Sequence, residues 1–141
     1  MNSSIQGDIG EAYAAAKMLE KEWVVLKPIG DNRKYDLVID RGLGFEKVQV
    51  KSTQCVNGCL IAATLTLHNT TKKSKAIQYT LDEVDLFCIY DRESRNLYLV
   101  DAKEYTEDDD FTIRKCIRLR IDMPKNNQTK GVVWAKDYIL K

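Results

Sequence analysis

Near the start of the chain, apolar residues recur at helical spacing. The stripe predicts a helix over residues 7–21 and consists of Ile9, Ala12, Tyr13, Ala16 and Leu19. Glu11 does not lie on the polar arc of this helix, because Ala15 and Met18 flank it at i+4 and i+7. A carboxylate beside apolar side chains costs free energy unless a partner satisfies it. Glu11 is therefore the first candidate for a functional residue.

After this helix the hydrophobic pattern changes to the two-residue period of strands. The predicted strands cover residues 23–27, 35–40, 45–52, 60–67, 86–90, 97–100 and 111–121. Thr80 to Glu83 has the spacing of a capping box, which indicates a short helical turn, and residues 132–140 are expected to form a short terminal helix. One helix followed by this series of strands predicts an α/β fold. The length of 141 residues favours a single domain.

The strands at 35–40 and 45–52 can be paired from the sequence. If residues 41–44 form a four-residue turn, Asp40 pairs with Phe45, and Asp36 falls opposite Gln49. Gln49 and Lys51 share one strand face because side chains alternate. We therefore expect Asp36, Gln49 and Lys51 to converge, and a register slip of one residue would separate them.

Composition places the chain among ordinary globular proteins, with 30% charged and 44% hydrophobic residues. It contains no apolar run near the roughly 20 residues that span a bilayer, and its first residues lack the order of a secretory signal. We therefore expect a cytoplasmic protein. Its four cysteines are predicted to be reduced thiols, since the spacing and the single histidine, His68, fit no standard zinc module.

The net charge of +1 conceals a separation of charge along the chain. Acidic residues concentrate in 101–110 and basic residues in 114–130, and such local patches attract polyanions. Arginine, asparagine and glutamine can also read base edges. The predicted DNA-binding residues are Lys72, Lys73, Lys75, Arg114, Arg118, Arg120, Lys125, Asn127, Gln128 and Lys130. The alternative is that these side chains form solvated surface.

Glu11, Asp36 and Gln49 would offer oxygen ligands beside Lys51, which suits Mg²⁺. A lysine at such a site can orient or deprotonate an attacking water while the cation polarises a phosphoryl oxygen. This chemistry indicates phosphodiester hydrolysis. Each residue also has a structural explanation: Asp36 could pair with Arg33, Glu11 with Lys17 or Lys51, Lys51 could snorkel, and Gln49 could form a cross-strand hydrogen bond.

These residues, in this order, resemble the PD-(D/E)XK nuclease superfamily. The resemblance runs through Gly10-Glu11, Tyr35-Asp36 and Gln49-Val50-Lys51, and the flanking segments GDIGEA, GDNRKYDLVIDRG, VQVKST, YTLDEVDLFCIY and NQTKGVVWAKDY extend it over nearly the whole chain. The chain is most similar to small homing endonucleases encoded in bacterial group I introns. The resemblance implies a restriction-endonuclease-like domain, with a central mixed β-sheet, an N-terminal helix and extra β-hairpin strands.

The resemblance also implies roles for individual residues. Glu11, Asp36, Gln49 and Lys51 would be catalytic, and Mg²⁺ would be held by Glu11, Asp36, the Gln49 side chain and the Val50 carbonyl, with Mn²⁺ expected to substitute. Two positions depart from the superfamily pattern: Gln49 replaces an acid, and Tyr35 replaces a proline. Because an amide brings no negative charge, Gln49 should weaken cation binding. The homing branch also carries glutamine there.

Three functions follow from the sequence. The first is a Mg²⁺-dependent, site-specific double-stranded DNA endonuclease of the homing type, acting as a homodimer or homotetramer because about 140 residues cannot cover a long DNA site. The second is a Holliday-junction resolvase, since fold does not fix function. The third is a catalytically silent DNA-binding module, which only Gln49 supports.

Overall fold

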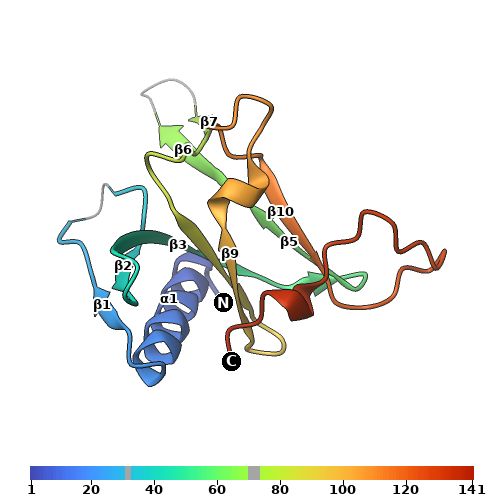
Figure 1. The fold of residues 1–141 in the computed structure, drawn as a ribbon, viewed down its shortest axis with the longest axis horizontal. Helices are drawn as coiled ribbons and strands as arrows, with labels where there is room; N and C mark the ends of the chain where they lie inside the picture. The colour runs from blue at the N-terminus through green and yellow to red at the C-terminus, as the bar shows by residue number, and fades with distance from the viewer. Residues whose placement is uncertain (31–32, 70–73) are drawn as a thin grey trace.

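In the computed structural model of the protein, which describes residues 1–30, 33–69 and 74–141, one helix packs against a five-stranded mixed sheet (Figure 1). The sheet has the order β1-β2-β3-β8-β9. Its elements are α1 (Ser3–Glu20), β1 (Val24–Leu26), β2 (Leu37–Asp40), β3 (Phe45–Thr53), β8 (Leu86–Asp91) and β9 (Leu97–Asp101). Strands β3 and β8 run parallel, while the other neighbours in the sheet are antiparallel. The α/β class expected from the sequence is confirmed.

Helix α1 begins earlier than the predicted residue 7, because Asn2 caps it. The Asn2 Oδ1 accepts hydrogen bonds from the backbone N–H groups of Ser4 at 2.7 Å and Ile5 at 3.3 Å. The predicted apolar stripe is not the buried face. Ala12, Tyr13, Ala16 and Leu19 are exposed and Ile9 is only partly buried, whereas the buried residues are Gly10, Ala14 and Met18. The true packing face is thus rotated towards Glu11, which explains why apolar residues flank this carboxylate.

Gly10 lets α1 approach the sheet closely. A Cβ at this position would lie 3.3 Å from the Cβ of Ser52 and 3.3 Å from Cδ1 of Tyr90, tighter than ordinary side-chain contacts. Helix α1 lies on the side of β3 that carries Val48 and Val50. Because strand side chains alternate, Gln49 and Lys51 belong to the opposite face of β3.

The β2–β3 hairpin has the predicted register. Asp40 pairs with Phe45 and Leu37 with Val48, across the turn at residues 41–44. The prediction is wrong at one step, because Asp36 leaves the ladder. Its N–H donates to the carbonyl of Val48 at 2.9 Å, so Asp36 and Leu37 both face Val48, as in a β-bulge. Asp36 therefore does not pair directly with Gln49, and its side chain is aimed by the bulge.

Two smaller sheets complete the fold, one in the order β10-β5-β4 and one formed by β6 and β7. Their strands are β4 (Cys55–Val56), β5 (Cys59–Ala63), β6 (Leu65–Asn69), β7 (Ser74–Gln78) and β10 (Cys116–Arg120). The predicted strand at 60–67 is broken at Thr64, which is buried and bonds through its N–H and Oγ1 to the carbonyls of Lys115 and Arg114. These bonds turn the chain from one small sheet into the other.

Other element boundaries differ from the sequence prediction. The strand predicted over 111–121 is shortened to β10, with Ile117 and Leu119 buried and Ile121 38% exposed. Thr80 to Glu83 forms a turn in which the Glu83 carboxylate accepts from the Thr80 N–H at 3.0 Å. Two 3₁₀ helices, η1 (Ala102–Tyr105) and η2 (Ala135–Asp137), lie in the C-terminal part, and η2 is all that forms of the helix predicted over 132–140.

The core consists of two apolar clusters. One lies between α1 and the sheet and includes Met18, Leu37, Ile39 and Cys88. The second packs Phe87 and Ile89 of β8 against residues from the β10-β5-β4 sheet. Within the described residues, no helix combines the length and apolarity needed to cross a membrane. All four cysteines have free thiols, and full burial raises the pKa of Cys88 to about 12.

Candidate active site

Asp36 sits directly before β2, at the point where β2 and β3 separate. Its Oδ2 accepts a 2.8 Å hydrogen bond from the N–H of Val50. Burial raises the pKa of the Asp36 carboxyl; the Val50 N–H opposes this shift, nearby Glu11 adds to it, and Lys51 and Lys27 oppose it. Asp36 therefore lies within electrostatic reach of a helix carboxylate and of two lysines.

The backbone of Val50 points towards Asp36. Successive residues of a strand direct their N–H and C=O groups to alternate sides, and Lys47 bonds through both groups to Asp85 on the β8 side. Val50 lies three residues further and so faces the β2 side, past the last paired residue of that strand. The carbonyl oxygen of Val50 therefore points to the β2 side of β3, the same side on which the Asp36 carboxylate bonds to the Val50 N–H.

Lys51 is half-buried on the face of β3 opposite α1. Its Nζ lies 5.4 Å from the ring centroid of Tyr79, within the range of a cation–π contact. Burial lowers the pKa of the Lys51 ammonium, and the negative charge of Asp36 partly counteracts this shift. Strongly desolvated lysines beside a carboxylate are candidates for functional sites.

Gln49 is half-buried on the same face of β3 as Lys51, and its backbone pairs with Phe87 of β8. Within the described residues, its amide has no hydrogen-bonding partner, so the structure does not supply the cross-strand bond that would give Gln49 a purely structural role. Its amide oxygen stays a candidate ligand, on the face of β3 that Lys51 shares.

Glu11 reaches the site from α1 and is paired with a residue that the sequence did not single out. Lys27 Nζ lies 2.8 Å from Glu11 Oε1, whereas Lys17 pairs with Glu20 on the same helix at 3.3 Å. Glu11 and Asp36 line one cavity of about 330 Å³, together with Lys27 and Arg33. The Glu11–Lys27 pair joins the helix to the end of β1, and no spacing along the chain could indicate it.

The donor set suits a hard divalent cation. Asp36, Glu11, the Gln49 amide and the Val50 carbonyl offer only oxygen atoms, which Mg²⁺ prefers. The described residues contain no group of three or more Asp, Glu, His or Cys side chains placed to hold a metal, as expected for a set with only two carboxylates. Glu11 raises the pKa of Asp36 by charge repulsion, which a cation between the two would relieve. Glu11 and Asp36 share one cavity, whereas Gln49 and Val50 are not in its lining, so the match of the four donors to Mg²⁺ rests on their oxygen chemistry.

Ser52 and Thr53 follow Lys51 on β3, but their side chains are engaged away from the candidate site residues. The Ser52 hydroxyl is buried beside Gly10 and lacks a hydrogen-bonding partner among the described residues, and the Thr53 hydroxyl donates to the carbonyl of Ile61 at 2.9 Å. Along β3, the candidate site residues therefore end at Lys51.

Many of the predicted DNA-binding residues line a second, larger concavity of about 730 Å³, here called the basic groove. Its predicted members are Arg114, Arg118, Arg120, Gln128 and Lys130. Lys115 and Asn126 add a charge and an amide, and Glu107 is the acid in its lining. The groove lies between β10 and the loop that follows it.

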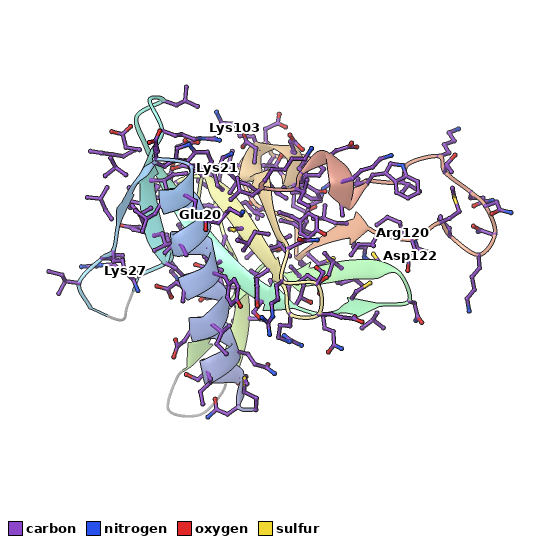
Figure 2. The ribbon with its side chains drawn as sticks, turned by 90° about the horizontal axis from the view of Figure 1, so that it is seen from below. Glu20, Lys21, Lys27, Lys103, Arg120 and Asp122 are labelled. Carbon is purple, nitrogen blue, oxygen red and sulfur yellow. The ribbon has the colours of Figure 1, made fainter. Side chains whose placement is uncertain are left out.

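The other predicted DNA contacts are not in the groove lining. Lys125 and Asn127 are exposed in the same loop, Lys75 is exposed on β7, and Lys72 and Lys73 lie outside the described residues. The groove is also distant from the candidate active site: Figure 2 places Arg120 and Lys27 on opposite sides of the molecule. The structure thus separates the basic surface from the carboxylates.

Comparison with known proteins identifies the class of this molecule. The sequence profile of the PD-(D/E)XK endonuclease family matches residues 1–141, so the chain belongs to this family of endonucleases, which typically use divalent metal ions. A similar solved structure is that of a bacterial homing endonuclease, I-Ssp6803I, with a TM-score of 0.73 and 23% sequence identity, covering 99% of this chain and 89% of that one. This likeness confirms the restriction-endonuclease-like fold. A search of curated proteins finds no match.

Proposed function

We propose that the protein is a Mg²⁺-dependent, site-specific double-stranded DNA endonuclease of the homing type. One observation carries the proposal: the Asp36 carboxylate is fixed on the Val50 backbone, within electrostatic reach of both Glu11 and Lys51. Membership of an endonuclease family and the structural likeness to a homing endonuclease support it.

Four groups would hold the cation: the carboxylates of Glu11 and Asp36, the amide oxygen of Gln49 and the carbonyl of Val50. When bound, Mg²⁺ supplies Lewis-acid polarisation of a phosphoryl oxygen, and Mn²⁺ should replace it. The Asp36 carboxylate is oriented for this task because one of its oxygens is held by the Val50 N–H. Its other oxygen would face the cation.

Lys51 would act on the attacking water. Its Nζ is held beside Tyr79 and close enough to Asp36 to feel its charge, so it can orient the water or accept its proton as the water oxygen bonds to phosphorus. The phosphorus–oxygen bond to the leaving group then breaks, its electron pair stays on the departing sugar oxygen, and that oxygen takes a proton from solvent. Burial favours this role, because a desolvated lysine is more often neutral than an exposed one.

The basic groove would bind DNA away from the cut. Its arginines can contact phosphates or guanine edges, and its amides can read adenine, which would provide the specificity that phosphate contacts lack. A homodimer or homotetramer would place two active sites on the two strands. The cytoplasm is the expected compartment.

The test is cleavage of a randomised linear duplex library beside a mobile four-way junction, in Mg²⁺ and in EDTA. Lys51→Ala removes the lysine of the site, and Lys103→Ala, on η1, is a matched control. Cuts at one enriched sequence that need Mg²⁺ and Lys51 would support the proposal. Cutting of the junction alone would identify a resolvase, and DNA binding without cleavage, unaffected by Asp36→Ala, would identify a silent binding module.

A further inference from the structure

Lys27 stands at the junction of β1 and the candidate active site. It follows the last residue of β1 and precedes Pro28, and its Nζ forms the 2.8 Å ion pair with Glu11 Oε1. The hydrogen bond and charge of Glu11 raise the pKa of Lys27, and the charges of Asp36 and Asp8 add to this effect. One ammonium therefore pairs with Glu11 and also lies within electrostatic reach of Asp36, the two carboxylates that would hold the cation.

The ion pair and a bound cation compete for the same group. A divalent ion coordinated by Glu11 and Asp36 would require carboxylate oxygens that face the cavity into which Lys27 also projects. The lysine side chain is 65% exposed and that of Glu11 is 24% exposed, so the lysine can leave into solvent while the carboxylate stays. Exposed ion pairs contribute little free energy, so breaking the Lys27–Glu11 pair to bind a cation costs little.

We propose that Lys27 is a positioning residue that holds Glu11 in the cation-free protein and releases it when a divalent cation binds. This inference rests on the proposed function, because the cation is the one that the candidate active site would take. Lys27 thereby lowers the affinity of the site for its cation, while in the absence of the ion it offsets the charge of Glu11 and keeps that carboxylate oriented.

Calorimetric titration of the DNA-free protein with Mg²⁺ tests this inference without relying on activity. Lys27→Met should bind Mg²⁺ about three- to tenfold more tightly than the wild type, because one weak ion pair and one repelling charge are removed. Lys27→Arg keeps the charge and should behave like the wild type. Lys17→Met is the matched control on α1, since Lys17 pairs with Glu20 at 3.3 Å, and it should leave the affinity unchanged.

A double-mutant cycle separates exchange from a general charge effect. If Lys27 competes for Glu11, the tightening caused by Lys27→Met should shrink strongly in a Glu11→Gln background. Equal tightening in both backgrounds, or no tightening in Lys27→Met, would overturn the inference while the proposed function stands. Absence of Mg²⁺ binding in the wild type and in both lysine variants would overturn the inference and the proposed metal dependence together.

Discussion

The Asp36 carboxylate accepts a 2.8 Å hydrogen bond from the backbone N–H of Val50, on the neighbouring strand. The bond lies where β2 and β3 separate, and there a side chain-to-backbone hydrogen bond takes the place of a backbone-to-backbone bond between the strands. It gives Asp36 a structural role beside its proposed chemical role. The two roles can be separated by substitution.

Asp36→Asn keeps an oxygen acceptor for Val50 and removes the charge, whereas Asp36→Ala removes both. We expect both variants to lose about 100-fold or more of Mg²⁺-dependent cleavage. Only Asp36→Ala should also lose stability, by about 1–3 kcal/mol, because it leaves the Val50 N–H without its partner. Cleavage assays and urea unfolding measure the two effects, and equal stability of the two variants would show that the hydrogen bond contributes nothing.

Lys51→Met should strongly reduce cleavage without lowering stability. The lowered pKa of Lys51 shows that burial disfavours its charge, so an apolar side chain of similar length should be tolerated or preferred. We expect an unchanged or higher melting temperature by circular dichroism, with cleavage reduced by about 100-fold or more. A clear fall in melting temperature would instead assign Lys51 a structural role beside Tyr79.

Gln49→Glu should restore the acid that most of the superfamily carries at this position. A third carboxylate raises the charge of the donor set, so Mg²⁺ should bind about tenfold more tightly, as measured by calorimetry. Gln54→Glu is the matched control, because it makes the same change at an exposed residue just after β3. Equal effects of the two substitutions would place Gln49 outside the ligand set.

Arg118→Gln tests the basic groove. If Arg118 contacts a phosphate, the variant should bind duplex DNA more weakly, and the slope of log affinity against log salt should fall by about 0.9. Fluorescence anisotropy over a series of salt concentrations measures both quantities. Lys103→Gln, outside the groove lining, should change neither, and an unchanged slope in Arg118→Gln would contradict a phosphate contact at this residue.

Gly58→Ala should destabilise the turn that supports the groove. Gly58 has a φ of +75°, its carbonyl accepts from the N–H groups of Ile121 and Asp122, and an added Cβ would lie 2.8 Å from the Cβ of Asp122. We expect a loss of about 2–4 kcal/mol in urea unfolding. Gly44→Ala has a similar φ of +89° but open space around it, so its loss should be only about 1–2 kcal/mol.

Local rules predicted the parts of the site that depend on neighbouring residues. The β2–β3 register follows from a four-residue turn, and strand alternation puts Gln49 and Lys51 on one face. The rules failed at Asp36, where a bulge replaces the ladder, and on α1, where Tyr13 and Leu19 of the predicted apolar stripe are exposed along with its alanines. Small residues such as Gly10 and Ala14 form much of the true packing face, and they contribute too little apolar area to indicate that face from the sequence.

Contacts between distant segments could not be predicted. The parallel pairing of β3 with β8 joins residues about 40 positions apart, and no turn connects them directly. The Glu11–Lys27 pair depends on the path of the chain after α1, and the grouping of Arg114, Arg118 and Gln128 depends on how the loop after β10 folds back. Charge counts identified the basic residues, but the separation of the groove from the carboxylates required the structure.

Gly10, one residue before Glu11, has a consequence for the site. Because this residue carries no side chain, α1 packs close to β3 and β8 at Ser52 and Tyr90. A Cβ at position 10 would require these neighbours or the helix to shift by a few tenths of an ångström. Since Glu11 is the next residue, the position of its carboxylate beside Asp36 depends on this close packing.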